Sequence, residues 1–505
     1  MDDARACTRT AIILSVSFLL IFTSYNGIEN LETSIIRGEC HNCLSGLLDG
    51  ICQSGTTCQA KVKFSCDEAC VAPFHECKSL LGSTILGVIY LAFMLNAFLG
   101  PLLPNYFGTK RSMVGGSVSY AIFAFANLAV SWTPGSLNFH WGLMIPVALL
   151  LGISASVMWI AQASYLTQVS VVYSKFKQES IVSSMGMFNG IFFAIYKASR
   201  VTGNLISSLV LGYLGWPTTT LFTIYSCLGL TGTALLCVLP SLPHHAASPS
   251  RLSSSLMATP DAQPPAARSG VSFRALWALA TDTRMLALAP VFVLNGLQQG
   301  FATSEFTSNF IRESLGSASI GYVMAVFGVV NVLASYTFGK LADKFDPLIG
   351  HAVGYGSLLT AYALCYALPV SKCDDKWVLV VAIAVLLSLG DAASTTLAKV
   401  VLGQEFPMDS VHAFSVFTVY QSGTVSASFF LLHYLRYVHH CHRHLFGKWM
   451  WYPSSTYYYC SFHGRLAVLI TMTLVASAAY ILYTKRFRRV VKDMPMSIQD
   501  ELFGE

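Results

Sequence analysis

The residues Gly339–Pro347 read GKLADKFDP, and they separate two apolar stretches, 318–339 and 350–369, that are each long enough to cross a membrane. Residues 100–111 read GPLLPNYFGTKR and separate two similar stretches earlier in the chain. Both turns begin with glycine, which lets two helices approach closely, and both carry basic side chains, which favour the cytoplasmic side of a membrane. The two turns therefore indicate a chain of two halves, with an equivalent cytoplasmic turn in each. The alternative is that they are two unrelated basic turns.

The composition indicates a membrane protein. Of the 505 residues, 54% are hydrophobic and 11% are charged, and the mean hydropathy is +0.56. An ordinary soluble domain has about 25% charged residues, so the sequence excludes a soluble enzyme or a nucleic-acid-binding domain. The net charge of +6 does not indicate a nucleic-acid partner, because the cytoplasmic loops of membrane proteins are usually basic.

Twelve apolar stretches fit spanning helices of about 20 residues each. The first resembles a signal peptide, but no small-residue cleavage site follows Phe22, so we expect it to be retained. Lysine and arginine are more frequent in the segments on the side of the two termini than in the segments on the other side. Because cytoplasmic segments are usually the more basic ones, we expect both termini to lie in the cytoplasm. The predicted spans are 11–36, 80–100, 113–131, 141–167, 183–212, 219–239, 285–309, 318–339, 350–369, 377–402, 412–435 and 465–484.

The spans divide into two groups of six. The first group fills residues 1–239 and includes a Cys-rich outer loop at 37–79. Residues 240–283 are rich in proline and serine, which predicts a flexible cytoplasmic linker. The second group fills residues 284–484, and residues 485–505 form a basic cytoplasmic tail.

The two glycine turns resemble the loop signature of the major facilitator superfamily, which has the core Gly-x-x-x-Asp-Lys. The resemblance implies an all-α membrane protein with twelve transmembrane helices in two six-helix halves, the major facilitator fold. It also implies that Gly339, Asp343 and Lys344 form a loop that controls conformational change. The first turn has Pro104 in place of the acid, so the same role does not extend to that copy.

Four stretches resemble one branch of this superfamily, the uncoordinated-93-like family. That resemblance implies an accessory role, because the family is known for regulating a potassium channel and for escorting other membrane proteins. The chain departs from the family in its Cys-rich outer loop, its Pro/Ser-rich linker and the charges in its first and fifth spans. The stretches that carry the resemblance are FTSYNGIENLETS at 22–34, MWIAQASYLT at 158–167, GNLISSLV at 203–210 and GLQQGFATSEFT at 296–307.

Seven Asp, Glu, Lys and Arg residues lie inside the predicted spans, away from the span ends. A charge at mid-bilayer costs about 2.5–3.5 kcal/mol on insertion scales, so each one is a candidate functional residue. Two acids share one face of the first helix and two bases share one face of the fifth, which predicts pairing between these helices. Such pairs could fix the packing, bind an anionic or zwitterionic solute, or couple to protons. The seven residues are Glu29, Glu32, Lys197, Arg200, Glu305, Asp391 and Lys399.

Asp391 is the strongest single candidate for a coupling or gating group, because it lies near the centre of the tenth span among small residues. The alternative is a hydrogen bond to a neighbouring helix. Gln162 and Gln298 could line the same cavity, although ordinary packing explains them as well.

Ten cysteines lie in segments that would face the lumen or the exterior, where disulfides persist. Seven of them crowd one short outer loop that has few apolar residues with which to fold. A zinc site is a poor explanation, because the pair at 40 and 43 has no second matching pair. The disulfide candidates are Cys40, Cys43, Cys52, Cys58, Cys66, Cys70, Cys77, Cys373, Cys441 and Cys460.

We expect an accessory or regulatory protein, with a secondary active transporter as the alternative. The residues alone favour a secondary active transporter of a small anionic or zwitterionic solute, whereas the resemblance favours an accessory protein for an ion channel or another membrane protein. No nucleotide-binding loop, metalloprotease motif or nucleophile elbow occurs, so we expect neither an enzyme nor a cofactor or metal. The expected location is the plasma membrane or an endosomal membrane.

Overall fold

The computed structural model describes most of the chain as helix. The described residues are 4–35, 39–40, 50–51, 81–97, 102–133, 136–178, 181–241, 273–344, 347–368, 370, 375–406, 410–445 and 454–488. Besides the helices there is one short hairpin, in which β1 (Glu39–Cys40) pairs antiparallel with β2 (Gly50–Ile51).

Each of the twelve predicted spans overlaps a helical segment, the shortest of which, Leu81–Asn96, has 16 residues. The first six are α1 (Ala4–Ile35), α3 (Leu81–Asn96), α5 (Thr109–Trp132), α6 (Leu137–Lys177), α7 (Ile181–Ser208, continued by the π-helical η1, Leu209–Tyr213) and α8 (Thr218–Val238), with a short α4 (Leu102–Phe107) in the turn after α3. The seventh span begins as α11 (Thr283–Gly300) and continues through the π-helical η2 (Phe301–Ile311) into α12 (Arg312–Leu315). The others are α13 (Ile320–Lys344, preceded by η3, Ser317–Ser319), α14 (Pro347–Ala367), α15 (Trp377–Glu405), α16 (Ser410–Leu445) and α17 (Ser454–Tyr483, continued by η4, Thr484–Arg488).

These helices form because lipid offers the backbone no hydrogen-bond partners, so each spanning segment must satisfy its own backbone groups. Within the described residues, nine helices are long and apolar enough to cross a membrane. Hydroxyl side chains inside them donate back to the preceding turn, as Ser15 does to the Ala11 carbonyl oxygen at 2.7 Å. The expectation of an all-α, multi-pass membrane fold is confirmed.

The end of the expected linker differs from the prediction. Residues 273–280 form the helix α10 (Phe273–Ala280), which packs against α16 and α11. The segment Phe-Arg-Ala-Leu-Trp-Ala-Leu-Ala has no proline or glycine, so it can continue as helix where the preceding proline-rich stretch cannot.

Glycines set the closest helix crossings in the first half. A Cβ atom at Gly152 of α6 would lie 2.3 Å from the Ile89 carbonyl oxygen of α3. A Cβ atom at Gly203 of α7 would lie 2.4 Å from the Thr23 carbonyl oxygen of α1. Both positions therefore require glycine to let the backbones approach.

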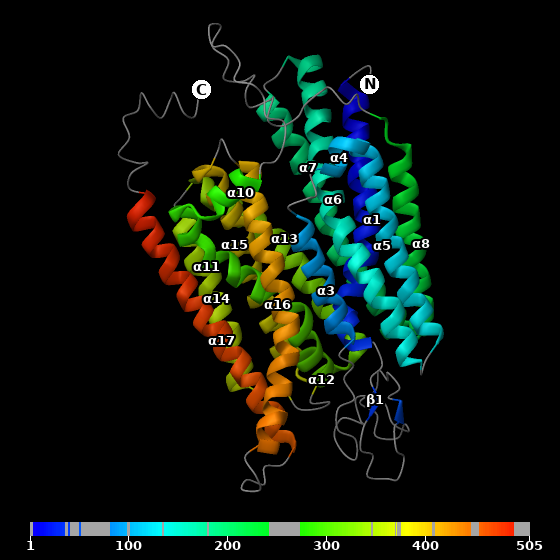
Figure 1. The fold of residues 1–505 in the computed structure, drawn as a ribbon, viewed down its shortest axis with the longest axis vertical. Coiled ribbons are helices and arrows are strands. Elements are labelled where there is room, and N and C mark those ends of the chain that lie inside the picture. The colour runs from blue at the N-terminus through cyan, green and yellow to red at the C-terminus, as the bar shows by residue number, and fades with distance from the viewer. Residues whose placement is uncertain are drawn as a thin grey trace.

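The two halves meet along two helix pairs, α3 with α16 and α7 with α13. In the first pair, the Ser426 hydroxyl donates to the Gly87 carbonyl oxygen at 2.8 Å. In the second pair, the Ser208 hydroxyl donates to the Ala318 carbonyl oxygen at 3.2 Å. α12 lies at the end of the bundle that carries β1, and both chain termini are marked at the opposite end (Figure 1). Ala318 lies just after α12 and Ser208 ends α7, so this contact lies at the β1 end.

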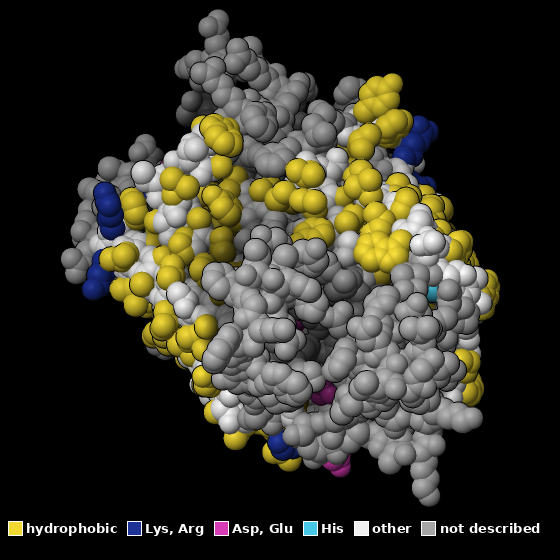
Figure 2. All heavy atoms as spheres, turned by 60° about the horizontal axis from the view of Figure 1, so that its bottom comes forward, with side chains coloured by type: hydrophobic (Ala, Val, Ile, Leu, Met, Phe, Trp, Pro, Cys, Tyr) yellow, Lys and Arg dark blue, Asp and Glu magenta, His cyan; other side chains and the backbone are white. Residues whose placement is uncertain are grey.

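Apolar side chains cover much of the described surface, and charged ones are sparse on the face shown in Figure 2. Residues such as Leu149, Leu150 and Ile153 of α6 are exposed although they are large and hydrophobic. Such a surface is costly in water and stable in lipid, which supports the membrane location.

Candidate functional site

Glu29 lies in α1 and is 2% exposed. Its Oε1 accepts a hydrogen bond from the Tyr90 hydroxyl of α3 at 2.6 Å and a longer one from the Tyr25 hydroxyl at 3.4 Å. Tyr25 stands one turn before Glu29, so the helix itself places the two side chains together. The Arg200 guanidinium interacts electrostatically with Glu29, but the described residues contain no ion pair within 4.0 Å between them.

Hydrogen bonds continue from Glu29 into the second half. The Gln299 Nε2 of α11 donates to the Tyr90 hydroxyl at 3.2 Å, and the Gln421 Nε2 of α16 donates to the Gln299 Oε1 at 3.1 Å. Glu29, Tyr90, Gln299 and Gln421 therefore form a chain through α1, α3, α11 and α16. We call these four residues the cross-half chain.

Asp391 of α15 accepts two hydrogen bonds from its own half. The Gln298 Nε2 donates to Oδ1 at 2.8 Å, and the Asn331 Nδ2 of α13 donates to Oδ2 at 2.7 Å. Next to it, the Asn295 Nδ2 donates to the hydroxyls of Ser394 and Thr395 at 3.0 and 2.8 Å. Both oxygens of this carboxylate are thus held by amide groups of the neighbouring helices.

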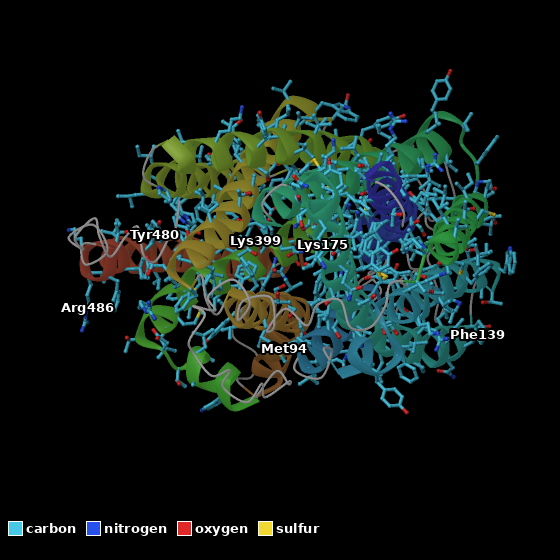
Figure 3. All side chains as sticks on the ribbon, turned by 90° about the horizontal axis from the view of Figure 1, so that it is seen from above. Met94, Phe139, Lys175, Lys399, Tyr480 and Arg486 are labelled. Atoms are coloured by element: carbon cyan, nitrogen blue, oxygen red, sulfur yellow. The ribbon has the colours of Figure 1, made fainter. Side chains whose placement is uncertain are left out.

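Three bases surround Asp391 from both halves of the molecule. Arg200, Lys197 and Lys399 all interact electrostatically with Asp391. Lys197 also interacts electrostatically with Lys399. The two α7 bases are half-buried, whereas the Lys399 side chain is exposed. Viewed from the end that carries the termini, Lys399 lies near the middle of the molecule (Figure 3).

The predicted pairing between α1 and α7 takes a different form in the structure. Glu29 and Arg200 interact at a distance, and Lys197 turns to the second half instead of to α1. Glu32 is 2% exposed, and neither of its carboxyl oxygens has a hydrogen-bond partner among the described residues. Gln162 is buried in α6 and takes no part in the cross-half chain.

Glu305 belongs to a separate cluster in the second half. Its Oε2 lies 2.8 Å from the Arg465 Nη2 of α17, and both side chains are 8% exposed. The Asn309 Nδ2 donates a short hydrogen bond to the same oxygen. Sequence reasoning missed Arg465 as the partner because it stands at the very start of the last predicted span.

An aromatic cluster lies beside the cross-half chain, on α1, α6 and α7. The Trp159 ring packs edge-on against Tyr196 at 5.1 Å between centroids and against Phe18 at 5.6 Å. Phe192 stacks on Tyr196 at 5.9 Å. Trp159 therefore serves packing in this structure, and the cluster fixes the part of α7 from which Lys197 and Arg200 project.

Several predicted residues have side chains outside the described part of the chain. Gly339 lies in α13 with open space beside it, but the side chains of Asp343 and Lys344 lie outside the described residues. The same holds for the side chains of all ten disulfide candidates, Cys40, Cys43, Cys52, Cys58, Cys66, Cys70, Cys77, Cys373, Cys441 and Cys460. Among the residues that the structure describes, no group of three His, Cys, Asp or Glu side chains could hold a metal ion.

Comparisons with solved structures place this architecture among transporters. A crystal structure of the peptide transporter POT matches with a TM-score of 0.61 at 10% identity, over 96% of this chain and 99% of that one. A D-xylose-proton symporter matches with a TM-score of 0.56 at 12% identity, over 93% and 96% of the two chains. At such low identity the likeness shows the fold alone, which is the major facilitator fold predicted from the two turns.

Comparisons of sequence identify the family. UNC93-like protein 3 of Arabidopsis thaliana is 27% identical over 444 residues, which is 85% of this chain and 82% of the relative. Protein unc-93 homolog A of Homo sapiens is 26% identical over 68% of this chain and 70% of its own length. The putative potassium channel regulatory protein unc-93 of Caenorhabditis elegans is 25% identical over 66% and 44%. The family described as "Ion channel regulatory protein UNC-93" matches residues 74–443, and the chain belongs to the UNC-93 family.

Proposed function

We propose that this chain is an accessory protein that regulates an ion channel, with a potassium channel as the first candidate partner. The family's description and the printed name of the Caenorhabditis elegans relative support this role. A transporter fold does not argue against it, because the same fold can serve different functions.

The observation that carries the proposal is that three of the four acids within the spans bind neighbouring helices, while the fourth, Glu32, has no hydrogen-bond partner among the described residues. Asp391 is held by Gln298 and Asn331, Glu29 by Tyr90, and Glu305 by Arg465. A carboxylate that must bind and release a proton or a solute in each cycle needs free oxygens, whereas these acids join neighbouring helices. Such contacts suit a scaffold that keeps its shape while it contacts another membrane protein.

The test is co-expression with a candidate potassium channel. The chain should co-purify with the channel and change its current in whole-cell recordings. Lys399→Gln serves as the internal control, because the structure gives Lys399 no hydrogen bond that holds helices together. Regulation should survive this substitution. A chain that neither binds candidate channels nor alters their currents would contradict the proposal.

A second candidate function is transport of a small anionic or zwitterionic solute, and the central bases favour it. Lys197, Arg200 and Lys399 outnumber the two acids near them, Glu29 and Asp391, and the exposed Lys399 ammonium is available to a ligand. Uptake of labelled solutes into vesicles that contain the purified protein tests this function. Transport should then be lost in Lys399→Gln, which is the opposite of the outcome expected for a channel regulator.

We also propose that both termini and the 240–283 linker face the cytoplasm, in the plasma membrane or an endosomal membrane, and that the protein is not an enzyme. The excess of basic residues in the inner segments supports this orientation. On the outer side, the ten cysteines would form disulfides within and between the outer loops. Mass spectrometry of the non-reduced protein tests the disulfides, and ten free thiols would contradict them.

A further inference from the structure

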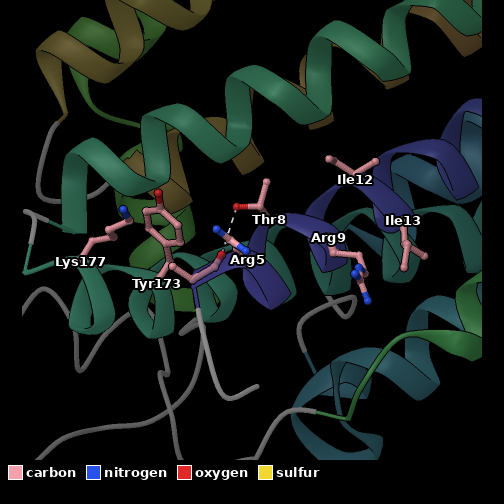
Figure 4. Close-up of a pocket in the computed structure, with 8 residues that line it drawn as sticks. Arg5, Thr8, Arg9, Ile12, Ile13, Tyr173 and Lys177 are labelled. Carbon is pink, nitrogen blue, oxygen red and sulfur yellow. Dashed lines mark hydrogen bonds between the residues drawn. The ribbon is translucent and has the colours of Figure 1, made fainter.

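A basic pocket lies at the end of the bundle that carries both termini, between the first turns of α1 and the last turns of α6 (Figure 4). Its volume is about 740 Å³. Arg5 and Arg9 line it from α1, and Tyr173 and Lys177 line it from α6. This volume is within the range of about 300–1,000 Å³ that is typical of small-molecule sites.

The charge of the pocket has one sign. Three of its lining side chains are basic and none is acidic. Arg5, Arg9 and Lys177 are exposed, and none of them forms an ion pair within the part of the chain that the structure describes. Arg5 and Arg9 are one helical turn apart on α1, so both guanidinium groups can reach the same ligand.

The rest of the lining adds hydrogen bonding and apolar contact. The Tyr173 ring is fixed edge-on against Phe188 of α7, at 5.1 Å between centroids. Ile12 and Ile13 of α1 form an apolar side of the pocket. A ligand that combines strong negative charge with some apolar surface fits this lining better than a simple inorganic anion.

The position relative to the membrane follows from helix length. α6 has 41 residues, which corresponds to about 60 Å, whereas the hydrocarbon core is about 30 Å thick. The last turn of α6 carries Lys175 and Lys177, and because charged side chains are costly in lipid, this end of the helix extends past the hydrocarbon core to the lipid headgroups and the adjoining water. At this level the pocket is accessible both to membrane lipids and to soluble molecules.

We propose that this pocket binds a group with two or more phosphates, presented by a phosphorylated inositol lipid or by a soluble polyphosphate. Guanidinium groups bind phosphate oxygens in pairs, and the lysine adds a point charge. Bound phosphates would bridge α1 to α6, so the ligand would regulate the first half of the molecule. This site is separate from the cross-half chain and goes beyond the channel-regulating function.

The experiment uses the purified full-length protein in nanodiscs. One arm compares phosphatidylcholine discs with discs that also contain phosphatidylinositol 4,5-bisphosphate, and the other arm adds soluble inositol hexakisphosphate to phosphatidylcholine discs. Binding is measured by native mass spectrometry and by the rise in unfolding temperature. Binding in the first arm alone assigns the site to a lipid headgroup, and binding in the second arm assigns it to phosphate chemistry as such.

The variant that tests the pocket is Arg5→Gln, Arg9→Gln, Lys177→Gln. We expect its apparent affinity to fall about tenfold or more, because each base near an anionic group contributes a several-fold gain. The matched control is Lys110→Gln, Lys175→Gln, Lys340→Gln, which removes the same charge at the same end but leaves the pocket lining intact. Its affinity should change by no more than about twofold.

Three results would overturn the proposal. They are absence of binding in both arms, an unchanged affinity in the pocket variant, and an equal loss in the pocket and control variants. Equal loss would mean that the general positive field attracts the phosphates. Asp2 and Asp3 precede α1 and lie outside the described residues, so Asp2→Asn, Asp3→Asn is a further check, and it should strengthen binding or leave it unchanged.

Discussion

Glu305 and Arg465 form a buried ion pair, and its energetics can be measured directly. Both side chains are 8% exposed, and their charged atoms lie 2.8 Å apart. Removing one partner leaves the other charge buried and unpaired, which typically costs about 3–5 kcal/mol. We therefore predict that Glu305→Gln and Arg465→Gln each lower the unfolding temperature strongly, while the double variant is less destabilised than the sum of the two.

The matched control for this cycle is the pair of Asp282 and Arg284, which lies 3.3 Å apart with side chains 28% and 39% exposed. An exposed pair contributes about 0–1 kcal/mol, so its coupling should be small. Additive losses for Glu305 and Arg465 in thermal unfolding would show that the buried pair has no coupling energy.

Tyr90 and Glu29 provide a second test at the residue scale. Their hydrogen bond of 2.6 Å joins a hydroxyl to a buried carboxyl group, and hydrogen bonds to charged groups contribute about 1.5–3 kcal/mol. We predict a coupling energy of this size between Tyr90→Phe and Glu29→Leu, which removes the accepting oxygen, measured by urea or thermal unfolding of the four proteins of the cycle. Coupling should be weaker between Glu29→Gln and Arg200→Gln, because no ion pair within 4.0 Å joins those two side chains in the described structure.

The sequence alone identified the buried acids but not their partners. An acid in an apolar span is visible as an exception to the local pattern. Tyr90 lies 61 residues from Glu29, and Asn331 lies 60 residues from Asp391. Neutral tyrosine and asparagine are ordinary in such helices, so only the packing of helices shows which of them reaches the acid.

At the scale of elements, the start of α11 depends on Asp282. Its side chain accepts a hydrogen bond from the Arg284 backbone N–H at 2.8 Å, as an N-cap. Loss of an N-cap typically costs about 0.5–2 kcal/mol. Asp282→Ala should therefore reduce the stability of this helix start more than Asp282→Asn, which keeps an accepting oxygen. Thermal unfolding of both variants measures the difference.

The same residue gives a pH dependence with a definite sign. Partial burial raises the pKa of the Asp282 carboxyl, but the hydrogen bonds from Arg284 outweigh it and lower the pKa below its ordinary value. The extra stability of the carboxylate is present above the unfolded pKa of about 3.9 and is lost as the pH falls through the lower folded pKa. The advantage of the wild type over Asp282→Asn should shrink in this acidic range, and an advantage that grows there would contradict the assignment.

The spanning helices were predictable because apolar runs of sufficient length have few other solutions in a membrane. Their internal irregularities were not. η1 and η2 are π-helical, and Glu305 and Asn309, four residues apart, are hydrogen-bonded within η2. The pattern of apolar residues does not distinguish a π-helical segment from an α-helical one. α10 was not predicted because the linker, 240–283, was judged by its overall content of proline and serine. Its last part, which forms α10, has neither proline nor glycine.

At the scale of the whole molecule, the apolar stretches together with the two related turns predicted the major facilitator fold that the solved structures share. The relation between the halves had to come from the structure. The cross-half chain joins α1 and α3 to α11 and α16, and the bases of α7 face Asp391 of the other half. The pairing of Lys197 with the acids of α1 stays a prediction, and the charged groups that act on Lys197 in the structure are Lys399, Asp391 and Arg200.

The arrangement of the halves predicts which side of the membrane reaches Lys399. The halves contact each other at the end that carries β1, where Ser208 meets Ala318 and a Cβ atom at Gly321 would lie 2.3 Å from the Asn204 carbonyl oxygen. Lys399 lies near the opposite end of α15 and is exposed, whereas its neighbour Ala398 is 2% exposed.

In a background with Cys227→Ser and Cys237→Ser, which removes the two exposed free thiols of the described residues, we predict a one-sided reaction. Lys399→Cys should react with a membrane-impermeant thiol reagent added from the side of the termini and remain unreactive from the other side. Ala398→Cys should be unreactive from both sides, because its side chain is buried against the neighbouring helices. Mass shifts after labelling of oriented membrane vesicles give the readout. Equal labelling of Lys399→Cys from both sides would mean that the contact between Ser208 and Ala318 does not close the bundle at its outer end.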